Sequence, residues 1–160
     1  MKQRFVFWMA MIACCAFIAS CAAPKKPAVE VEPEQLTTEE PDIRTGEWME
    51  ESNLATVYFD YDKAVLRSDA KTALKENAEY LKENADLEVL VEGHCDERGT
   101  IEYNMALGQR RAAAVRDYLS KLGISKGRIS TISYGEEKPV DYGHTEAAWA
   151  KNRRAEFKVR

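Results

Sequence analysis

The stretch Glu92–Val115, EGHCDERGTIEYNMALGQRRAAAV, contains side chains whose types suit binding chemistry. Asp96 supplies a carboxylate, and Arg111 supplies a guanidinium, the group that grips a carboxylate with two parallel hydrogen bonds. Side by side, they would suit a ligand that carries both an ammonium and a carboxylate, such as an amino-acid group. Whether they meet depends on the elements that carry them.

Arg111 occupies a position in its predicted helix where an apolar residue is expected. At about 100° per residue around the helix axis, Arg111 falls about 40° and Asn104 about 60° from Leu107. These angles lie within the apolar stripe that also contains Val115 and Leu119. A guanidinium on the buried face needs an acidic partner or a ligand, because burying an unpaired charge is costly.

Two aspartates follow the first two predicted strands, Asp60 the first and Asp96 the second. In sheets with parallel strands, ligands bind in the crevice beyond the carboxyl ends of the strands. We expect that crevice to hold both aspartates together with Arg111 and Asn104, with backbone amides at the start of the helix as further donors. The alternative is structural, with Asp96 and Arg111 forming an internal ion pair that ties a loop to a helix.

The hydrophobic pattern predicts alternating strands and helices from Leu54 onward. Ser68 is the expected N-cap of the first helix, and Gly123 is expected to end the second helix in a left-handed conformation. The predicted strands are 55–59, 87–92, 128–135 and 155–159, and the predicted helices are 68–84, 103–122 and 146–152.

This order of elements predicts an α+β fold. Two strand-helix-strand units imply neighbouring parallel strands, with both main helices on one face of the sheet. We therefore predict a small mixed four-stranded sheet with two main helices packed on it, in one domain spanning residues 54–160.

The N-terminal residues are typical of an export signal. Two basic residues precede an apolar run over 5–19, which predicts a signal peptide over residues 1–20. The residues Ile18–Cys21 resemble the lipobox of bacterial lipoproteins, in which cleavage precedes the cysteine and that cysteine is lipid-modified. Because Ala22 follows rather than an aspartate, the resemblance implies the inner leaflet of the outer membrane.

Residues 21–53, from the lipidated Cys21 onward, are rich in proline and glutamate and lack a periodic apolar pattern. This composition predicts that the segment is a flexible tether, which could span at most ~110 Å when fully extended. Trp48 and Met49 interrupt this pattern, and they would either dock on the folded domain or contact a partner. We favour docking.

Charge and cysteine content exclude several classes of protein. Without Lys2 and Arg4, 21 basic residues face 27 acidic ones, and a net charge of −6 argues against a nucleic-acid partner. Removal of the signal and acylation of Cys21 leave Cys95 as the one thiol, so no disulfide can form within a mature chain.

Two other kinds of site could be built from residues of the stretch 92–115, a metal site and a hydrolase with a cysteine nucleophile. A metal site from His94, Cys95, Asp96 and Glu97 lacks a second pair of ligands at zinc-like spacing, and consecutive side chains of an extended segment point in alternating directions. A thiol hydrolase pairing Cys95 with His144 lacks a recognisable nucleophile turn and an orienting partner. We therefore predict no metal, no cofactor and no catalysis.

Four motifs together resemble the OmpA C-terminal-like domain family: FDYDKAVL, EGHCDERGTIEYNMALGQRRAAAVRDYL, SYGEEKP and AWAKNRRAEF. The resemblance covers essentially all of Ala55–Val159. It implies an OmpA-like βαβαβ(α)β sandwich that binds the peptidoglycan stem peptide non-covalently, chiefly through its diaminopimelate residue.

The resemblance also implies roles for individual residues. Asp96 should accept the diaminopimelate ammonium and Arg111 should grip a carboxylate, and loss of either should weaken wall binding without unfolding the domain. The other residues that it places at the site are Phe59, Asp60, Asn104, Leu107, Asn152, Arg153 and Arg154. Which of the two adjacent arginines faces the ligand stays open.

The partners implied by the resemblance are peptidoglycan and a TolB-type β-propeller protein. Such a protein would act in the Tol-Pal system, which joins the outer membrane to the wall during division, and would bind its two partners one at a time. The alternative is a related peptidoglycan-binding lipoprotein that serves a different envelope assembly.

Overall fold

The structure is a computed structural model, and it describes residues 47–160. The predicted signal peptide (1–20), the lipidation site Cys21 and the tether up to residue 46 lie outside the described residues. None of the helices within residues 47–160 is long and apolar enough to cross a membrane.

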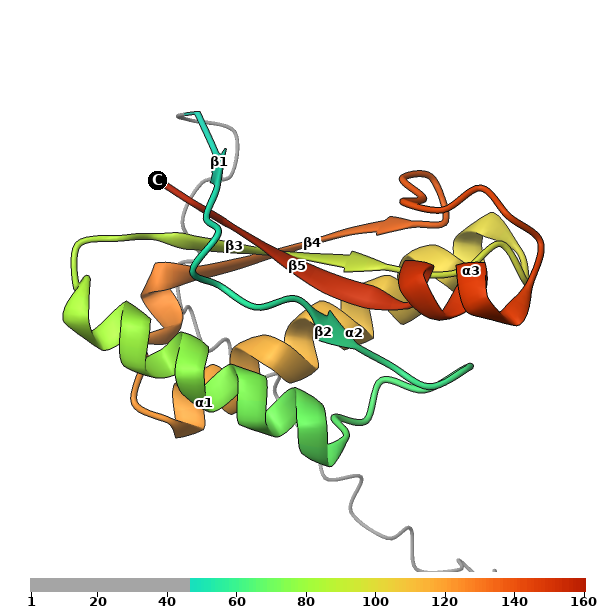
Figure 1. The fold of residues 1–160 in the computed structure, drawn as a ribbon. Helices are drawn as coiled ribbons and strands as arrows, with labels where there is room; N and C mark the ends of the chain where they lie inside the picture. The colour runs from blue at the N-terminus through green and yellow to red at the C-terminus, as the bar shows by residue number, and fades with distance from the viewer. Residues whose placement is uncertain (1–46) are drawn as a thin grey trace, which may run out of the picture. The chain divides into compact units, whose positions relative to one another are not determined.

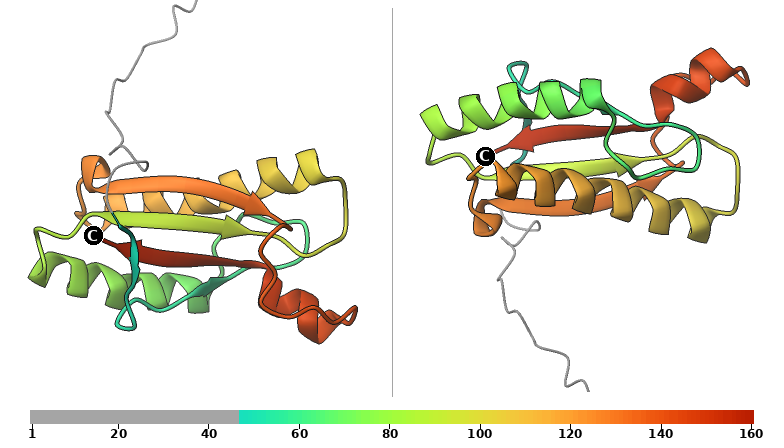
Figure 2. Two further views of the ribbon diagram at one scale, coloured as in Figure 1. Left: turned by 90° about the horizontal axis from the view of Figure 1, so that it is seen from above. Right: turned by 90° about the horizontal axis from the view of Figure 1, so that it is seen from below.

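A mixed sheet with helices on one face forms the domain, which confirms the predicted α+β class (Figure 1). Figure 2 shows the same layers from above and below, with β4, β3 and β5 side by side; α1 and α2 lie behind them in the left view and in front of them in the right view. The elements are β1 (Met49–Glu50), β2 (Val57–Tyr58), α1 (Ser68–Glu83), β3 (Val89–His94), α2 (Ile101–Lys121), a 3-10 turn (Lys126–Arg128), β4 (Ile129–Gly135), α3 (Glu146–Asn152) and β5 (Arg154–Val159).

The sheet has five strands in the described residues, where four were predicted. Its order is β1-β5-β3-β4, and β2 also pairs with β5. The β3–β4 pair is parallel as expected, whereas β5 runs antiparallel to β1, β2 and β3. The expected pairing of the first predicted strand with the second is therefore wrong, because β5 from the end of the chain lies between β2 and β3.

The fifth strand extends the sheet beyond the predicted domain start at Leu54. Met49 pairs with Val159, and the guanidinium of Arg160 lies 4.6 Å from the centre of the Trp48 ring. These contacts confirm the prediction that Trp48 and Met49 dock on the domain. The pattern around residue 49 gave no strand signal because a two-residue edge strand is too short to show alternation.

Both long helices start differently from the prediction. The difference lies in the N-cap residue of α1 and in the first residue of α2. Arg67, not Ser68, is the N-cap of α1, and its side chain makes no cap hydrogen bond. The second helix begins two residues earlier than predicted, since the hydroxyl of Thr100 accepts from the backbone N–H of Tyr103 at 3.2 Å. Gly123 ends α2 with φ of 101°, as expected.

The hydrophobic core lies between the sheet and the two long helices. The apolar stripes of α1 and α2 meet the inward-facing residues of β3 and β5, at the spacings that an amphipathic helix and an alternating strand require. The core residues from these four elements are Ala70, Leu74, Ala78, Leu81, Val89, Val91, Ala112, Val115, Leu119, Ala155, Phe157 and Val159.

Two glycines let α2 cross the sheet at close range. A Cβ atom on Gly93 would lie 2.0 Å from the backbone oxygen of Gly108, and one on Gly108 would lie 2.2 Å from the hydroxyl of Ser133. A register shift follows between Gly93 and His94, and such bulges redirect side chains at strand ends. The contact fixes the distance between the carboxyl end of β3 and the turn of α2 that carries Arg111.

We predict that Gly93→Ala destabilises the domain, because its methyl group would overlap backbone that has no rotamer to change. The free energy of unfolding in urea should fall by at least about 2 kcal/mol. Gly127→Ala is the matched control: Gly127 is exposed, and its nearest atom would be 3.7 Å away, so the change should stay below about 1 kcal/mol. Equal effects of the two substitutions would contradict the close crossing.

Candidate functional site

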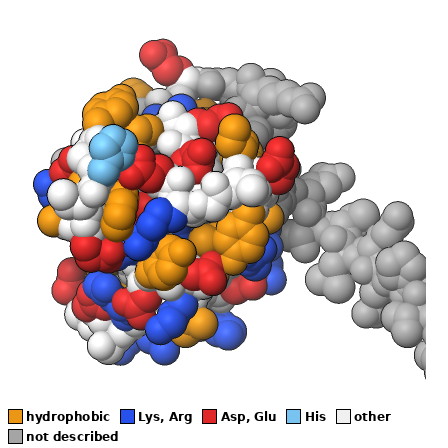
Figure 3. All heavy atoms as spheres, turned by 90° about the vertical axis from the view of Figure 1, so that its right-hand side faces the viewer, with side chains coloured by type: hydrophobic (Ala, Val, Ile, Leu, Met, Phe, Trp, Pro, Cys, Tyr) orange, Lys and Arg blue, Asp and Glu red, His pale blue; other side chains and the backbone are white. Residues whose placement is uncertain are grey.

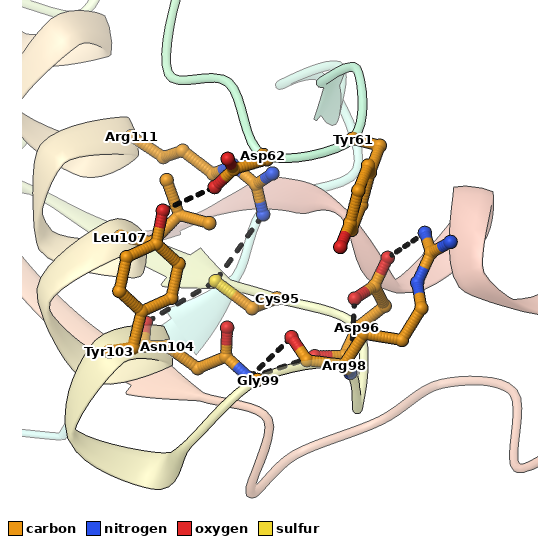
Figure 4. A pocket seen from close by; sticks show the side chains of 10 residues that line it. All are labelled: Tyr61, Asp62, Cys95, Asp96, Arg98, Gly99, Tyr103, Asn104, Leu107 and Arg111. Carbon is orange, nitrogen blue, oxygen red and sulfur yellow. Dashed lines mark hydrogen bonds and ion pairs between the residues drawn. The ribbon is translucent and has the colours of Figure 1, made fainter.

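A small cavity of about 120 Å³ lies where the carboxyl end of β3, the first turns of α2 and the loop after β2 meet (Figure 4). This is the crevice in which the sequence predicted a ligand site. Its lining residues are Tyr61, Asp62, Cys95, Asp96, Arg98, Gly99, Tyr103, Asn104, Leu107 and Arg111.

Arg111 is fully buried at the base of this cavity and binds backbone oxygens of two separate segments. Its Nη1 donates to the carbonyl of His94 at 2.7 Å, at the end of β3. Its Nε donates to Lys63 at 2.9 Å and its Nη2 to Asp60 at 3.2 Å, both carbonyls of the loop after β2. The side chain therefore ties α2 to the strand end and to that loop.

None of the ion pairs formed among residues 47–160 includes Arg111. Burial lowers the pKa of this guanidinium, yet arginine keeps its proton in proteins, so the group remains a cation. Beyond the three carbonyls it donates only to the thiol of Cys95 at 3.4 Å, which leaves one N–H of Nη2 without a partner among the described residues. The cavity thus contains a guanidinium that no described carboxylate contacts in an ion pair, although Asp96 and Asp62 line the same cavity.

Asp96 is buried, and its hydrogen-bond partners are two arginines other than Arg111. Its Oδ2 accepts from Arg98 Nη2 at 2.6 Å and from Arg153 Nη1 at 3.1 Å. Burial raises the pKa of Asp96, but the hydrogen bonds from Arg98 and Arg153 outweigh it and hold the pKa below its ordinary value. The alternative of an internal Asp96–Arg111 ion pair is therefore wrong, because two other arginines occupy the carboxylate.

Arg98 closes one side of the cavity. Its guanidinium lies between two aromatic rings, 3.9 Å from the centre of Tyr61 and 4.1 Å from that of Trp149. It is partly exposed, whereas Arg153 is buried and also binds the carbonyl of Phe59 and the carboxylate of Glu146. Of the two partners of Asp96, Arg98 is the more exposed.

Asn104 and Leu107 form the helix side of the cavity, as the sequence predicted. The amide of Asn104 donates to the carbonyls of Asp96 and Arg98, at 3.2 and 3.3 Å, and to Glu136 Oε2 at 2.5 Å. With its donors used this way, Asn104 holds the 96–99 loop in place.

Asp62 and Tyr103 were missed by the sequence analysis. The hydroxyl of Tyr103 donates to Asp62, and the two side chains form part of the cavity wall in Figure 4. Asp62 has φ of 55°, a left-handed conformation that aspartate tolerates better than most residues. The predicted Asp60 instead pairs with Lys63 and Arg67 outside the cavity and contributes only its backbone oxygen to Arg111.

The remaining predicted residues lie around the cavity without lining it. Phe59 is buried, with its ring centre 5.2 Å from the guanidinium carbon of Arg111. Asn152 binds the backbone of Val140 and Asp141 and so fixes the loop before α3. Of the two adjacent arginines, Arg153 reaches Asp96, whereas Arg154 pairs with Glu156 on β5.

The geometry disfavours both alternatives built on Cys95. Burial raises the pKa of its thiol to about 11, so the group is neutral near pH 7 and a poor nucleophile. His144 pairs with Glu97 instead, through Nδ1 at 2.7 Å. The four residues His94 to Glu97 do not converge as metal ligands, because Asp96 is held by arginines and Glu97 by His144 and Trp149.

The surface around this end of the domain mixes acidic, basic and hydrophobic side chains, without a large area of one kind (Figure 3). The exposed aromatic residues that line the cavity are Tyr61 and Tyr103. A mixed rim of this kind suits a polar ligand with short apolar stretches.

Comparison with known proteins identifies a family. Residues 58–153 match the profile of the OmpA family. The peptidoglycan-associated lipoprotein of Pasteurella multocida is 54% identical over 100 residues, which cover 62% of this chain and 67% of that protein. Across the curated relatives compared, this chain spans 59% to 67% of their length.

Two solved structures share the fold. The peptidoglycan-associated lipoprotein from Burkholderia pseudomallei superposes with a TM-score of 0.64 and 47% identity, over 66% of this chain and 89% of that one. The cell wall anchor of the T6SS from Pseudomonas aeruginosa gives a TM-score of 0.57 and 30% identity, over 65% and 78%.

The contacts of Arg111 predict that its substitution lowers the stability of the domain, which we did not expect from the sequence. Arg111→Lys keeps the charge but leaves buried carbonyls unpaired, and the free energy of unfolding should fall by about 3 kcal/mol. Arg110→Lys, at the exposed neighbouring position, should change it by less than about 0.5 kcal/mol. Chemical denaturation of the two variants checks this, and an unchanged stability of Arg111→Lys would show that the carbonyl contacts do not hold the loop.

Proposed function

This chain belongs to the OmpA family, and we propose on that premise that its cavity binds the peptidoglycan stem peptide non-covalently. The ligand group is the free end of diaminopimelate, which carries an ammonium and a carboxylate on one carbon. Binding at this cavity anchors the outer membrane to the cell wall and involves no catalysis. The names of the relatives from Pasteurella multocida and Burkholderia pseudomallei support this assignment.

The observation that carries the proposal is the charge arrangement in the cavity. Arg111 is a buried cation that carbonyls solvate and that no described carboxylate contacts in an ion pair. Asp96 lines the same small cavity and stays ionised. A buried guanidinium with spare donor capacity favours an anionic group, and a nearby carboxylate favours a cationic one. An amino-acid group satisfies both with one carbon between its charges.

Binding requires two rearrangements, because the cavity has to open onto the fully buried Arg111 and Arg98 has to move. The ligand carboxylate meets the N–H of Arg111 Nη2 that no described residue accepts from. The ligand ammonium reaches Asp96 by displacing Arg98, which is the more exposed of its two arginine partners. Arg153 stays in place, so the carboxylate of Asp96 keeps its orientation throughout.

The size of the cavity limits what enters it. A space of about 120 Å³ accommodates the end of one side chain and excludes a whole glycopeptide. The rest of the stem peptide therefore lies across the rim, where the exposed rings of Tyr61 and Tyr103 offer apolar contact.

The anchoring role combines this cavity with the N-terminal segment. We propose that lipid on Cys21 holds the chain in the inner leaflet of the outer membrane and that the following residues act as a tether. Because β1 begins at Met49, this tether could reach at most about 90 Å. Many copies confined near the wall would attach firmly even if each contact is weak.

The proposed partners are peptidoglycan and a TolB-type β-propeller in the Tol-Pal system, with a role in envelope integrity and division. A second candidate is a peptidoglycan anchor of another envelope assembly, which the 30% identity to the cell wall anchor of the T6SS supports. The higher identities, 54% and 47%, are to peptidoglycan-associated lipoproteins and favour the first candidate. Co-purification of a β-propeller with the lipidated protein separates the two.

We predict that residues 22–160 sediment with purified diaminopimelate-type sacculi and not with lysine-type sacculi. Asp96→Asn keeps the shape of the side chain but removes its charge, and it should weaken retention at least about tenfold, the cost of one charge-assisted hydrogen bond. Asp117→Asn, near the other end of α2, is the control and should bind like the original chain.

Circular dichroism in the near ultraviolet verifies that each variant is folded before sedimentation. If folded Asp96→Asn is retained as strongly as the control, the cavity is not the wall-binding site. Equal retention by the two wall types would contradict recognition of diaminopimelate.

A further inference from the structure

Three side chains that could bind a metal converge on the face of the sheet that α1 and α2 do not cover. Glu92 and His94 on β3 and Glu156 on β5 each offer one ligand atom, and these atoms lie within 4.8 Å of one another. In Figure 2 both strands run side by side on this face, opposite to the helices. The function proposed for the cavity makes no use of these three side chains.

The strand register brings the two glutamates together. Glu92 lies directly opposite Glu156 in the antiparallel β3–β5 pair, and like charges at directly opposite positions are destabilising. The imidazole Nε2 of His94 lies 4.0 Å from Glu92 Oε2 and 3.8 Å from Glu156 Oε2. Two acidic oxygens and one ring nitrogen therefore face a common point.

His94 is 1% exposed, and neither of its ring nitrogens has a hydrogen-bond partner among the described residues. Burial lowers its pKa to about 4, so the ring is neutral near pH 7. The distances from Nε2 to both carboxylates are too long for hydrogen bonds. The ring stacks on Tyr134, but two buried nitrogens without hydrogen bonds are costly, and the neutral imidazole is already in the protonation state that binds a metal.

Basic side chains occupy the far oxygens of both carboxylates. Arg154 Nε donates to Glu156 Oε1 at 2.6 Å, and Lys158 Nζ lies 3.7 Å from Glu92 Oε1. Each glutamate is thereby oriented with its Oε2 toward His94. The same cations reduce the negative charge of the cluster, so they also limit its affinity for a metal.

We propose that Glu92 Oε2, His94 Nε2 and Glu156 Oε2 form a binding site for a divalent transition metal ion such as Zn²⁺. A tetrahedral zinc ion holds neighbouring N and O ligands about 3.4 Å apart, so the two separations from Nε2 need to shorten by about half an ångström. The two carboxylate oxygens, which lie within 4.8 Å of one another, need to approach to a similar distance. One imidazole and two carboxylates, with a fourth position left for water, match the ligand types that zinc accepts. Glu156 is 30% exposed and provides the entry path.

The test is equilibrium dialysis of the full-length chain, purified in detergent, against ZnCl₂ at pH 7. We expect one zinc ion per chain. His94→Gln and Glu156→Gln should each lower the affinity at least tenfold, and the second position is partly exposed, so that variant is expected to fold even if the first does not. Lys158→Gln should raise the affinity, because it removes a competing cation.

His144→Gln is the matched control, since this second histidine is exposed and pairs with Glu97. It should bind zinc like the original chain. The proposal is overturned if zinc does not bind, if folded His94→Gln and Glu156→Gln bind it unchanged, or if His144→Gln or Cys95→Ser removes the binding instead.

Discussion

The rest of the structure depends on the burial of one guanidinium. Arg111 takes a position that a leucine could fill, and its charge must be solvated by the protein because water does not reach it. The carbonyls of His94, Asp60 and Lys63 do this, so the strand end and the loop after β2 are held at one distance from α2. Carbonyls supply partial charge only, so the guanidinium keeps hydrogen-bonding capacity that suits an anion.

Successive side chains at the carboxyl end of β3 lie in different environments. His94 belongs to the outer face of the sheet, Cys95 contacts Arg111 and Asn104 inside, and Asp96 borders the cavity. The bulge after Gly93 and the bare backbone of Gly108 make this possible, because α2 passes so close that no side chain fits between them. The backbone of His94 thereby joins the two faces, since its carbonyl holds Arg111 while its ring faces the two glutamates.

Much of this fold followed from periodicity. The long helices, their buried faces and the misplaced arginine of α2 were predictable because 3.6-residue spacing is a strong signal over sixteen or more residues. The position of β2 in the sheet was not predictable, because β2 pairs with β5, which is formed by the last residues of the chain. The partners of Asp96 were missed for a similar reason, as Arg153 lies 57 residues away. The place of Asp62 in the cavity wall was not predictable, because its backbone is left-handed and the sequence has no glycine there to indicate such a conformation.

The proposed contact between Arg111 and the ligand carboxylate is tested most directly by the side-chain Nε–H resonance of Arg111. This proton is held by a carbonyl in a fully buried group. The Nε–H of the half-buried Arg128, which donates to the carbonyl of Leu87 at 2.9 Å, serves as an internal reference. Addition of free meso-diaminopimelate to a labelled sample of residues 22–160 should shift the Arg111 resonance and leave that of Arg128 unchanged. A stationary Arg111 resonance at ligand concentrations that saturate sacculus competition would contradict the account.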